Sequence, residues 1–85
     1  MRVRLELYAS LMGYLPAGAN RHATECELPD GSTAHELLDR FGVPRDKAHL
    51  VLRNGVFLHA PERDAPLLVD GDVIVIRREG PKGGP

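Results

Sequence analysis

The chain has 85 residues, of which 42% are hydrophobic and 27% are charged, and its formal net charge is −1. This length allows one small domain, and the composition is ordinary for a soluble globular protein. The near-neutral charge argues against a nucleic-acid partner and against a basic membrane anchor, and no apolar run is long enough to span a membrane. Because the first residues also lack the apolar segment of a signal peptide, we expect a cytoplasmic protein.

The first part of the chain predicts two strands. Residues 2–9 alternate in hydrophobicity, and the inward face is formed by Val3, Leu5, Leu7 and Ala9. Residues 11–20 are expected to be irregular, since glycine and proline interrupt them. Residues 22–28 alternate again and place Cys26 on the inward face, before a turn at Pro29-Asp30-Gly31.

One convincing helix follows, and its ends are marked in the sequence. Thr33 and Glu36 have the T-x-x-E spacing of a capping box. Helical spacing is kept by Ala34, Leu37, Leu38 and Phe41. Gly42 is expected just past the last turn, and Pro44 prevents the helix from continuing. The sequence therefore predicts a short helix between these signals.

The second half predicts three further strands. Residues 49–53 and 56–59 flank Asn54-Gly55, the pair that favours a type I′ hairpin turn. Residues 61–69 are expected to connect this hairpin to a last strand over 73–78. That strand is rich in β-branched residues and apolar on both faces, which indicates a central position in the sheet.

The predicted order is two strands, one helix and three strands. Such a chain closes a single core only if the helix packs across one face of the sheet. We therefore predict an α+β fold of the β-grasp (ubiquitin-like) type, with a mixed sheet of about five strands and one main helix on one face. The domain is expected to cover residues 1–78, and residues 79–85 are expected to form a flexible tail.

The body of the predicted domain offers no active site. The four histidines lack the spacing of metal ligands, so no metal is expected. A single cysteine excludes an internal disulfide framework, and Cys26 is interpreted as a buried, inert thiol. No nucleophile–base arrangement and no phosphate-binding loop is present. We expect no intrinsic catalysis and no bound cofactor.

The sheet face away from the helix is the remaining candidate surface. If Val3, Leu5 and Leu7 point toward the helix, part of the last strand must face outward. The predicted docking residues on this face are Tyr8, Arg53, Phe57, Ile74 and Ile76, with Val51 and the alternates Val73 and Val75. Two interpretations stay open: scattered surface apolar residues covered by arginine side chains, or an apolar docking patch with a charged rim.

Several segments, in this order, resemble the sulfur-carrier family of ubiquitin-like proteins. They are Tyr8-Ala9-Ser10-Leu11, Leu28-Pro29-Asp30-Gly31-Ser32-Thr33, Phe41-Gly42-Val43-Pro44, Leu50-Val51-Leu52-Arg53-Asn54-Gly55, Leu68-Val69-Asp70-Gly71-Asp72-Val73 and the diglycine Gly83-Gly84. The family includes the small subunit of molybdopterin synthase and the thiamine-pathway sulfur carrier. The longer segment after the first strand is more similar to the molybdopterin-synthase subunit.

The resemblance implies a function for the tail. In the family, an E1-like adenylyltransferase uses ATP to adenylate the terminal glycine, which then becomes a thiocarboxylate for cofactor biosynthesis. The matching position is Gly84, with Gly83 and Lys82 threading into the partner. A synthase large subunit is a second implied partner, and the chain itself is a carrier rather than an enzyme.

Pro85 departs from this pattern, because the family ends in Gly-Gly with a free carboxylate. Three explanations stay open: Pro85 is removed, the partner tolerates it, or sulfur carriage has been lost. We favour removal. The competing function is a non-catalytic ubiquitin-like interaction module or a protein modifier without sulfur transfer. A third possibility, an RNA-binding β-grasp domain, is disfavoured by the neutral charge.

Overall fold

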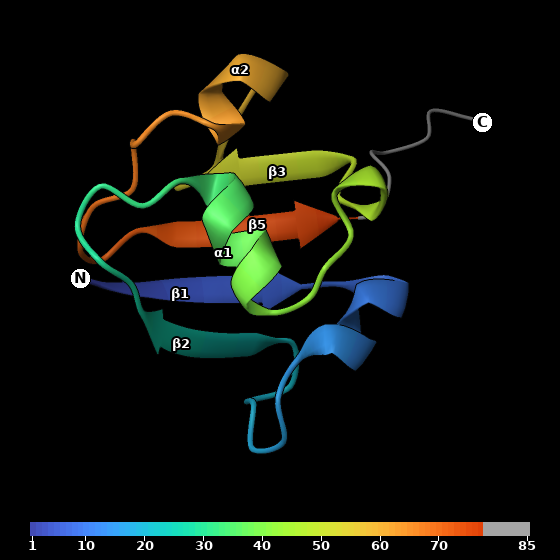
Figure 1. Ribbon diagram of the computed structural model, residues 1–85. Helices are drawn as coiled ribbons and strands as arrows, with labels where there is room; N and C mark the ends of the chain where they lie inside the picture. The colour runs from blue at the N-terminus through green and yellow to red at the C-terminus, as the bar shows by residue number, and fades with distance from the viewer. Residues whose placement is uncertain (78–85) are drawn as a thin grey trace.

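The computed structural model describes residues 1–77, in which five strands form one mixed sheet (Figure 1). The strands are β1 (Arg2–Leu7), β2 (Ala23–Glu27), β3 (Leu50–Arg53), β4 (Val56–Phe57) and β5 (Val73–Arg77). Their order across the sheet is β2-β1-β5-β3-β4, and β1 and β5 run parallel while the other neighbours are antiparallel. The predicted order of strands and main helix is confirmed, and so is the central position of the last strand.

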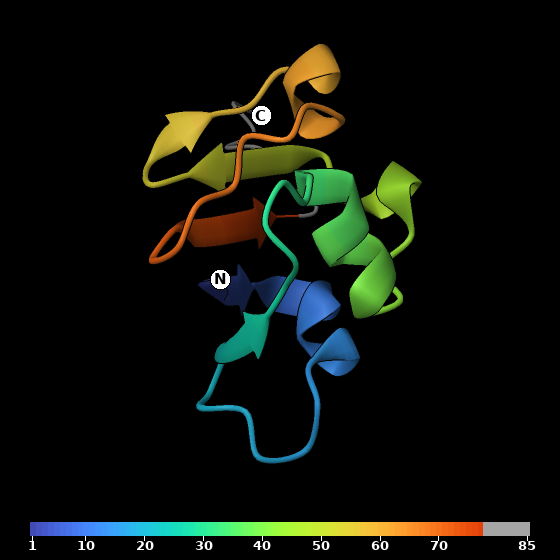
Figure 2. The same cartoon turned by 60° about the vertical axis from the view of Figure 1, so that its left-hand side comes forward.

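Helix α1 (Ala34–Arg40) packs across one face of this sheet (Figures 1 and 2). The core between the two layers takes alternate residues from the central strands and the apolar side of the helix. Its fully buried large side chains are Val3, Leu5, Leu7, Leu11, Leu37, Leu38, Val51, Ile74 and Ile76. This two-layer arrangement explains why the opposite face of the sheet is left to the solvent.

The ends of α1 are as the sequence predicts. The Thr33 hydroxyl accepts a hydrogen bond from the Glu36 backbone N–H at 3.0 Å, and the Glu36 carboxylate accepts one from the Thr33 N–H at 2.9 Å. At the other end Gly42 has a positive φ of 73°. There the N–H of Gly42 donates to Asp39 O, and that of Val43 donates to Leu38 O. These two bonds are those of a Schellman cap.

The connecting segments contain short helices that the sequence did not predict. A 3-10 helix, η1 (Ala9–Tyr14), covers the start of the segment expected to be irregular, and its Leu11 is buried. A second, η2 (Arg45–Lys47), follows Pro44, and a four-residue helix, α2 (Ala60–Arg63), lies in the predicted connection. The burial of Leu11 accounts for η1, because one buried apolar side chain can stabilise a short helix in a segment whose sequence has no periodic pattern.

Two boundaries of the predicted strands were wrong. Ala9 does not continue β1, because its φ is 55° and its side chain is exposed at the start of η1. The second arm of the hairpin ends at Phe57 rather than at His59. The hairpin turn itself is confirmed, since Asn54 and Gly55 have positive φ values of 52° and 85°.

The largest correction concerns which residues of β5 and β3 face the helix. Ile74 and Ile76 are 0% exposed, as is Val51, so all three belong to the core and none can line an outer surface. Parallel pairing with β1 sets Ile74 beside Leu5 and Ile76 beside Leu7, both of which point toward α1. The outward positions of β5 therefore belong to Val73 and Val75, the alternates noted from the sequence.

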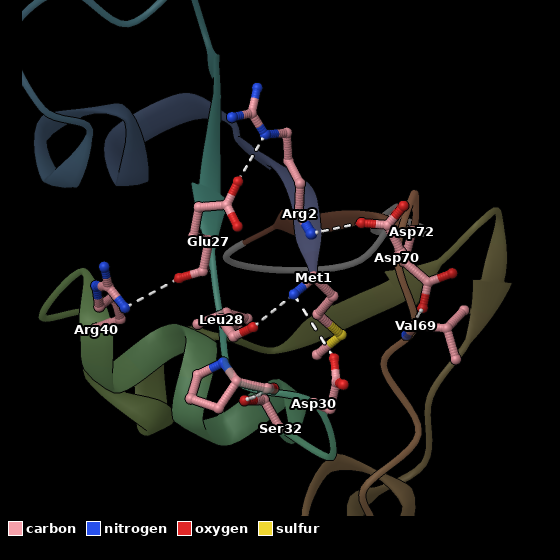
Figure 3. A network of polar contacts seen from close by, with 11 residues as sticks. Met1, Arg2, Glu27, Leu28, Asp30, Ser32, Arg40, Val69, Asp70 and Asp72 are labelled. Atoms are coloured by element: carbon pink, nitrogen blue, oxygen red, sulfur yellow. Dashed lines mark hydrogen bonds and ion pairs between the residues drawn. The ribbon is translucent and has the colours of Figure 1, made fainter.

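The first residue of the chain closes the sheet against the loop before α1 (Figure 3). The Met1 amino group donates a hydrogen bond to Leu28 O at 2.9 Å and lies 3.7 Å from Asp30 Oδ1. Next to it, the Arg2 backbone N–H donates to Asp70 Oδ1 at 2.7 Å. These contacts tie the start of β1 to two separate turns.

Candidate functional site

The sheet face opposite α1 carries an apolar row that crosses three strands. Val75 of β5 pairs with Leu52 of β3, which pairs with Phe57 of β4. Val75 and Leu52 are half-buried, Phe57 is 38% exposed, and none of the three belongs to the core cluster. We call this surface the outer sheet face and these three residues the outer row.

A polar cluster borders the outer row on the β1 side. The Tyr8 hydroxyl donates to Glu6 Oε1 at 2.7 Å, and Arg4 Nε donates to Glu6 Oε2 at 2.9 Å. The hydrogen bond from Tyr8, and to a lesser extent that from Arg4, lowers the pKa of Glu6. The same bond between Tyr8 and Glu6 raises the pKa of Tyr8. The Arg77 guanidinium lies 4.8 Å from the Tyr8 ring centroid, and the His22 ring centroid is 4.3 Å from it. Tyr8 is therefore held at the edge of the outer sheet face.

The other border of the row is built around Phe57. The Arg63 guanidinium of α2 lies 5.7 Å from the Phe57 ring centroid, and His59 packs edge-on at 4.7 Å. Arg63 also donates to the carbonyl oxygens of Leu58, Ala48 and His49. Because this arginine is fixed by three backbone acceptors, it forms a stable cationic rim beside the exposed ring.

Arg53 makes a structural contact rather than lying free on the surface. Its Nε donates to Asp72 Oδ2 at 2.7 Å, and 29% of the Arg53 side chain is exposed. Asp72 also accepts from Asn54 Nδ2 at 2.9 Å and from the Val69 N–H at 2.9 Å. Burial acts to raise the pKa of Asp72, but the hydrogen bonds from Arg53, Val69 and Asn54 outweigh it and lower the pKa.

The structure thus brings together only part of the predicted docking set. Tyr8 and Phe57 lie at the two borders of the outer row, and Arg53 lies beyond its end in an ion pair. At the centre of the row, sequence reasoning named Val75 only as an alternate and did not select Leu52. The signal that could have found Leu52 is alternation from Val51, once Val51 is known to face inward. The predicted activation site at Gly84, with Gly83 and Lys82, lies outside the described residues.

Ionisable groups elsewhere in residues 1–77 are dispersed. His35 Nδ1 lies 2.6 Å from Asp64 Oδ1, and this hydrogen bond lowers the pKa of Asp64. Cys26 packs against the core as predicted but is only half-buried; burial raises the pKa of its thiol, although Arg40 acts against this. Within these residues no group of three or more His, Cys, Asp or Glu side chains could hold a metal ion, and no helix is long and apolar enough to cross a membrane.

An open cleft of about 560 Å³ lies beside the loop before α1. Its charged lining consists of Asp30, Glu36, Asp39 and Arg40. Glu36 is used in the helix cap, Asp39 pairs with Arg45 at 2.8 Å, and Arg40 donates to Glu27 O. These groups are thus engaged in holding the fold, which leaves the outer sheet face as the stronger candidate site.

Comparison with known proteins defines the fold. No protein-family model matches the chain, and no curated protein matches it. The crystal structure of SAMP1 from Haloferax volcanii is similar, with a TM-score of 0.65, 18% sequence identity and 100% coverage of both chains. The chain has the ubiquitin-like β-grasp fold. The fold class predicted from the sequence is therefore confirmed.

Proposed function

We propose that this chain is a sulfur carrier whose terminal glycine, Gly84, is activated by an E1-like adenylyltransferase after removal of Pro85. The partner uses ATP, and the chain holds no cofactor of its own. The activated glycine becomes a thiocarboxylate that supplies sulfur to cofactor biosynthesis, of the molybdopterin type. The chain acts as the substrate of its partner and, at most, as the small subunit of a synthase.

The observation that carries this proposal is the position of β5. It is the central strand, hydrogen-bonded to β1 on one side and to β3 on the other, and the sequence from its end leads to Gly83-Gly84. The tail therefore starts from a strand that is held on both sides. Beside it, the outer row and its charged borders form a surface against which a partner can dock.

In the proposed reaction the only group of this chain that changes is the terminal carboxylate of Gly84. A carboxylate is a poor electrophile, so its oxygen must first attack the α-phosphorus of ATP, which releases pyrophosphate and leaves an acyl adenylate. Sulfur from a persulfide or sulfide donor then attacks the acyl carbon, and AMP leaves. Glycine suits such a terminus because it lacks Cβ and lets the backbone enter a narrow channel.

Intact mass spectrometry of the chain purified from its native host tests the proposal. We expect a species that has lost Pro85, together with one in which sulfur replaces a carboxyl oxygen of Gly84. In vitro, removing Pro85 should permit adenylation by the E1-like partner, and Gly84→Ala in that shortened chain should block it. A chain that always ends in an unmodified Pro85, and is never adenylated, would overturn the proposal.

A second candidate function is a protein modifier without sulfur transfer. The likeness to SAMP1, a ubiquitin-like small archaeal modifier, favours it. Both functions begin with the same activation of Gly84 and diverge at the acceptor. A thiocarboxylate on the isolated chain supports the carrier, whereas an amide bond from Gly84 to lysines of other proteins supports the modifier.

A further inference from the structure

Lysine is scarce in this chain. Of its eleven basic residues only Lys47 and Lys82 are lysines, and the others are arginines. The distinction matters beside an activated carboxyl group, because a deprotonated amine attacks an acyl carbon whereas the guanidinium of arginine keeps its proton in proteins. Lys47 is the only lysine in the part of the chain that the structure describes.

The side chain of Lys47 is available. It is exposed at the end of η2, and within residues 1–77 its ammonium makes no hydrogen bond or ion pair. Arg45, in the same turn, is by contrast paired with Asp39 at 2.8 Å. The backbone around Lys47 is fixed, because its N–H donates to Pro44 O at 3.0 Å and the next residue, Ala48, is 2% exposed.

The other amine of the described residues is engaged in the fold (Figure 3). The Met1 amino group donates to Leu28 O and pairs with Asp30. Acylation of this group would remove its charge and place a new substituent between the start of β1 and the loop before α1. Acylation of Lys47 disturbs no hydrogen bond or ion pair of its ammonium within residues 1–77, so modifying Met1 should destabilise the fold more than modifying Lys47.

The position of Lys47 also leaves it accessible beside a docked partner. Its turn lies on the same side of the sheet as α1 (Figure 2), whereas the outer row lies on the opposite face. A partner that covers the outer sheet face therefore does not have to cover Lys47.

We propose that Lys47 is the acceptor at which a second, activated copy of this chain becomes attached, an inference that rests on the proposed activation of Gly84. In the reaction the uncharged Nζ attacks the acyl carbon of the Gly84 adenylate. A carbon–nitrogen bond forms, the carbon–oxygen bond to AMP breaks, AMP leaves with the bonding electron pair, and the amine proton goes to solvent. The product is a dimer joined by one isopeptide bond, with no change in oxidation state.

The test incubates the chain lacking Pro85 with its E1-like adenylyltransferase and ATP, while pyrophosphate release and covalent dimer are measured together. Trypsin cleaves after Lys82, so the acceptor lysine should carry Gly83-Gly84 as a mass tag. We expect this tag on Lys47, loss of at least nine-tenths (about tenfold) of the dimer in Lys47→Arg, and little change in the matched control Asp46→Asn, at the neighbouring exposed position of η2.

The outcomes separate the two proposals. Absence of pyrophosphate release overturns the proposed function and this inference with it. Pyrophosphate release without dimer, or dimer that persists in Lys47→Arg, overturns the inference alone. A limiting amount of an amine-reactive acetylating ester, applied to the full chain, gives an independent readout: Lys47 should be modified several-fold more than Met1. Preferential modification of Met1 would contradict the assignment.

Discussion

At the scale of single residues, Asp72 joins parts of the chain that are far apart in sequence. Asp72 is 3% exposed. Its carboxylate accepts hydrogen bonds from Arg53, Asn54 and Val69. Its backbone carbonyl accepts from the Arg4 N–H at 2.9 Å. The hairpin turn, the turn before β5 and the edge of β1 therefore meet at one buried acid.

We expect Asp72→Asn to lower the free energy of unfolding by about 1–3 kcal/mol, because an amide cannot accept all three donors and leaves one of them buried without a partner. Urea unfolding at neutral pH measures this loss. Asp46→Asn, at an exposed position in η2, is the matched control and should behave as wild type. Equal stability of wild type and Asp72→Asn would contradict the role of the carboxylate.

The same residue predicts a dependence on pH. The pKa of Asp72 is lower in the folded chain than its ordinary value of 3.8. Its contribution is therefore complete above that ordinary value and is lost as the pH falls through the folded pKa below it. The stability difference between wild type and Asp72→Asn should shrink on acidification below about pH 4. A difference that stayed constant down to pH 2 would show that the ionised form is not what stabilises the turn.

At the scale of elements, α1 depends on its capping box because a short helix has few internal hydrogen bonds to share the cost of its ends. Thr33→Ala should lower the free energy of unfolding by about 1 kcal/mol, which corresponds to a fall in Tm of roughly 4–8 °C for a domain of this size. Thermal unfolding measures the shift. Thr33→Ser keeps the hydroxyl and should stay close to wild type, so equal losses in both variants would count against the cap.

These elements also show what the sequence could and could not predict. The ends of α1 and the Asn54-Gly55 turn were predicted correctly, since each depends on backbone preferences of neighbouring residues. The faces of β5 were not, because Val73, Ile74, Val75 and Ile76 are all apolar and periodicity cannot tell inward from outward. That choice is made by pairing with Leu5 and Leu7 of β1, a contact between opposite ends of the chain.

The candidate site was predicted unevenly for the same reason. Tyr8 and Phe57 were selected from the sequence and lie half-buried and exposed, respectively, at the two borders of the outer row, and their role in docking stays a prediction. Arg53 was selected without its partner, since its ion pair with Asp72 joins two turns that the sequence keeps far apart. The outer row could be recognised only after the register of β3 and β5 was known.

If the partner docks on the outer row, substitutions in this row should weaken its binding. Phe57→Ala and Leu52→Ala should each raise the apparent KM of the E1-like partner for this chain, by roughly 5–30-fold, as expected when a large apolar side chain is removed from an interface. The kcat should change little, because neither side chain carries a group that takes part in the reaction of the acyl carbon. Val69→Ala is the matched control, since Val69 is 53% exposed but lies outside the row. Unchanged KM in both row variants would exclude this face as the docking surface.

At the scale of the whole molecule, the fold and the proposed chemistry occupy different parts of the chain. The buried side chains that form the described core all lie between Val3 and Ile76. The parallel pairing of β1 with β5 places the end of the sheet beside Tyr8, where Arg77 covers the ring. We therefore expect residues before Gly80 to supply the stability of the fold. Residues after Gly80, including Gly83-Gly84, are expected to contribute only to activation.

This separation makes the last prediction. A chain that ends at Gly80 should unfold at the same urea concentration as the full chain, because it retains every core residue and every hydrogen bond described within residues 1–77. It should nevertheless give no pyrophosphate release with the E1-like partner and ATP, since its terminal carboxylate, on Gly80, is four residues short of the position of Gly84. As a competitor, the shortened chain should still inhibit activation of the chain ending at Gly84, because it keeps the outer sheet face. Loss of stability on shortening would place part of the fold in the tail, and failure to compete would place the docking energy there instead.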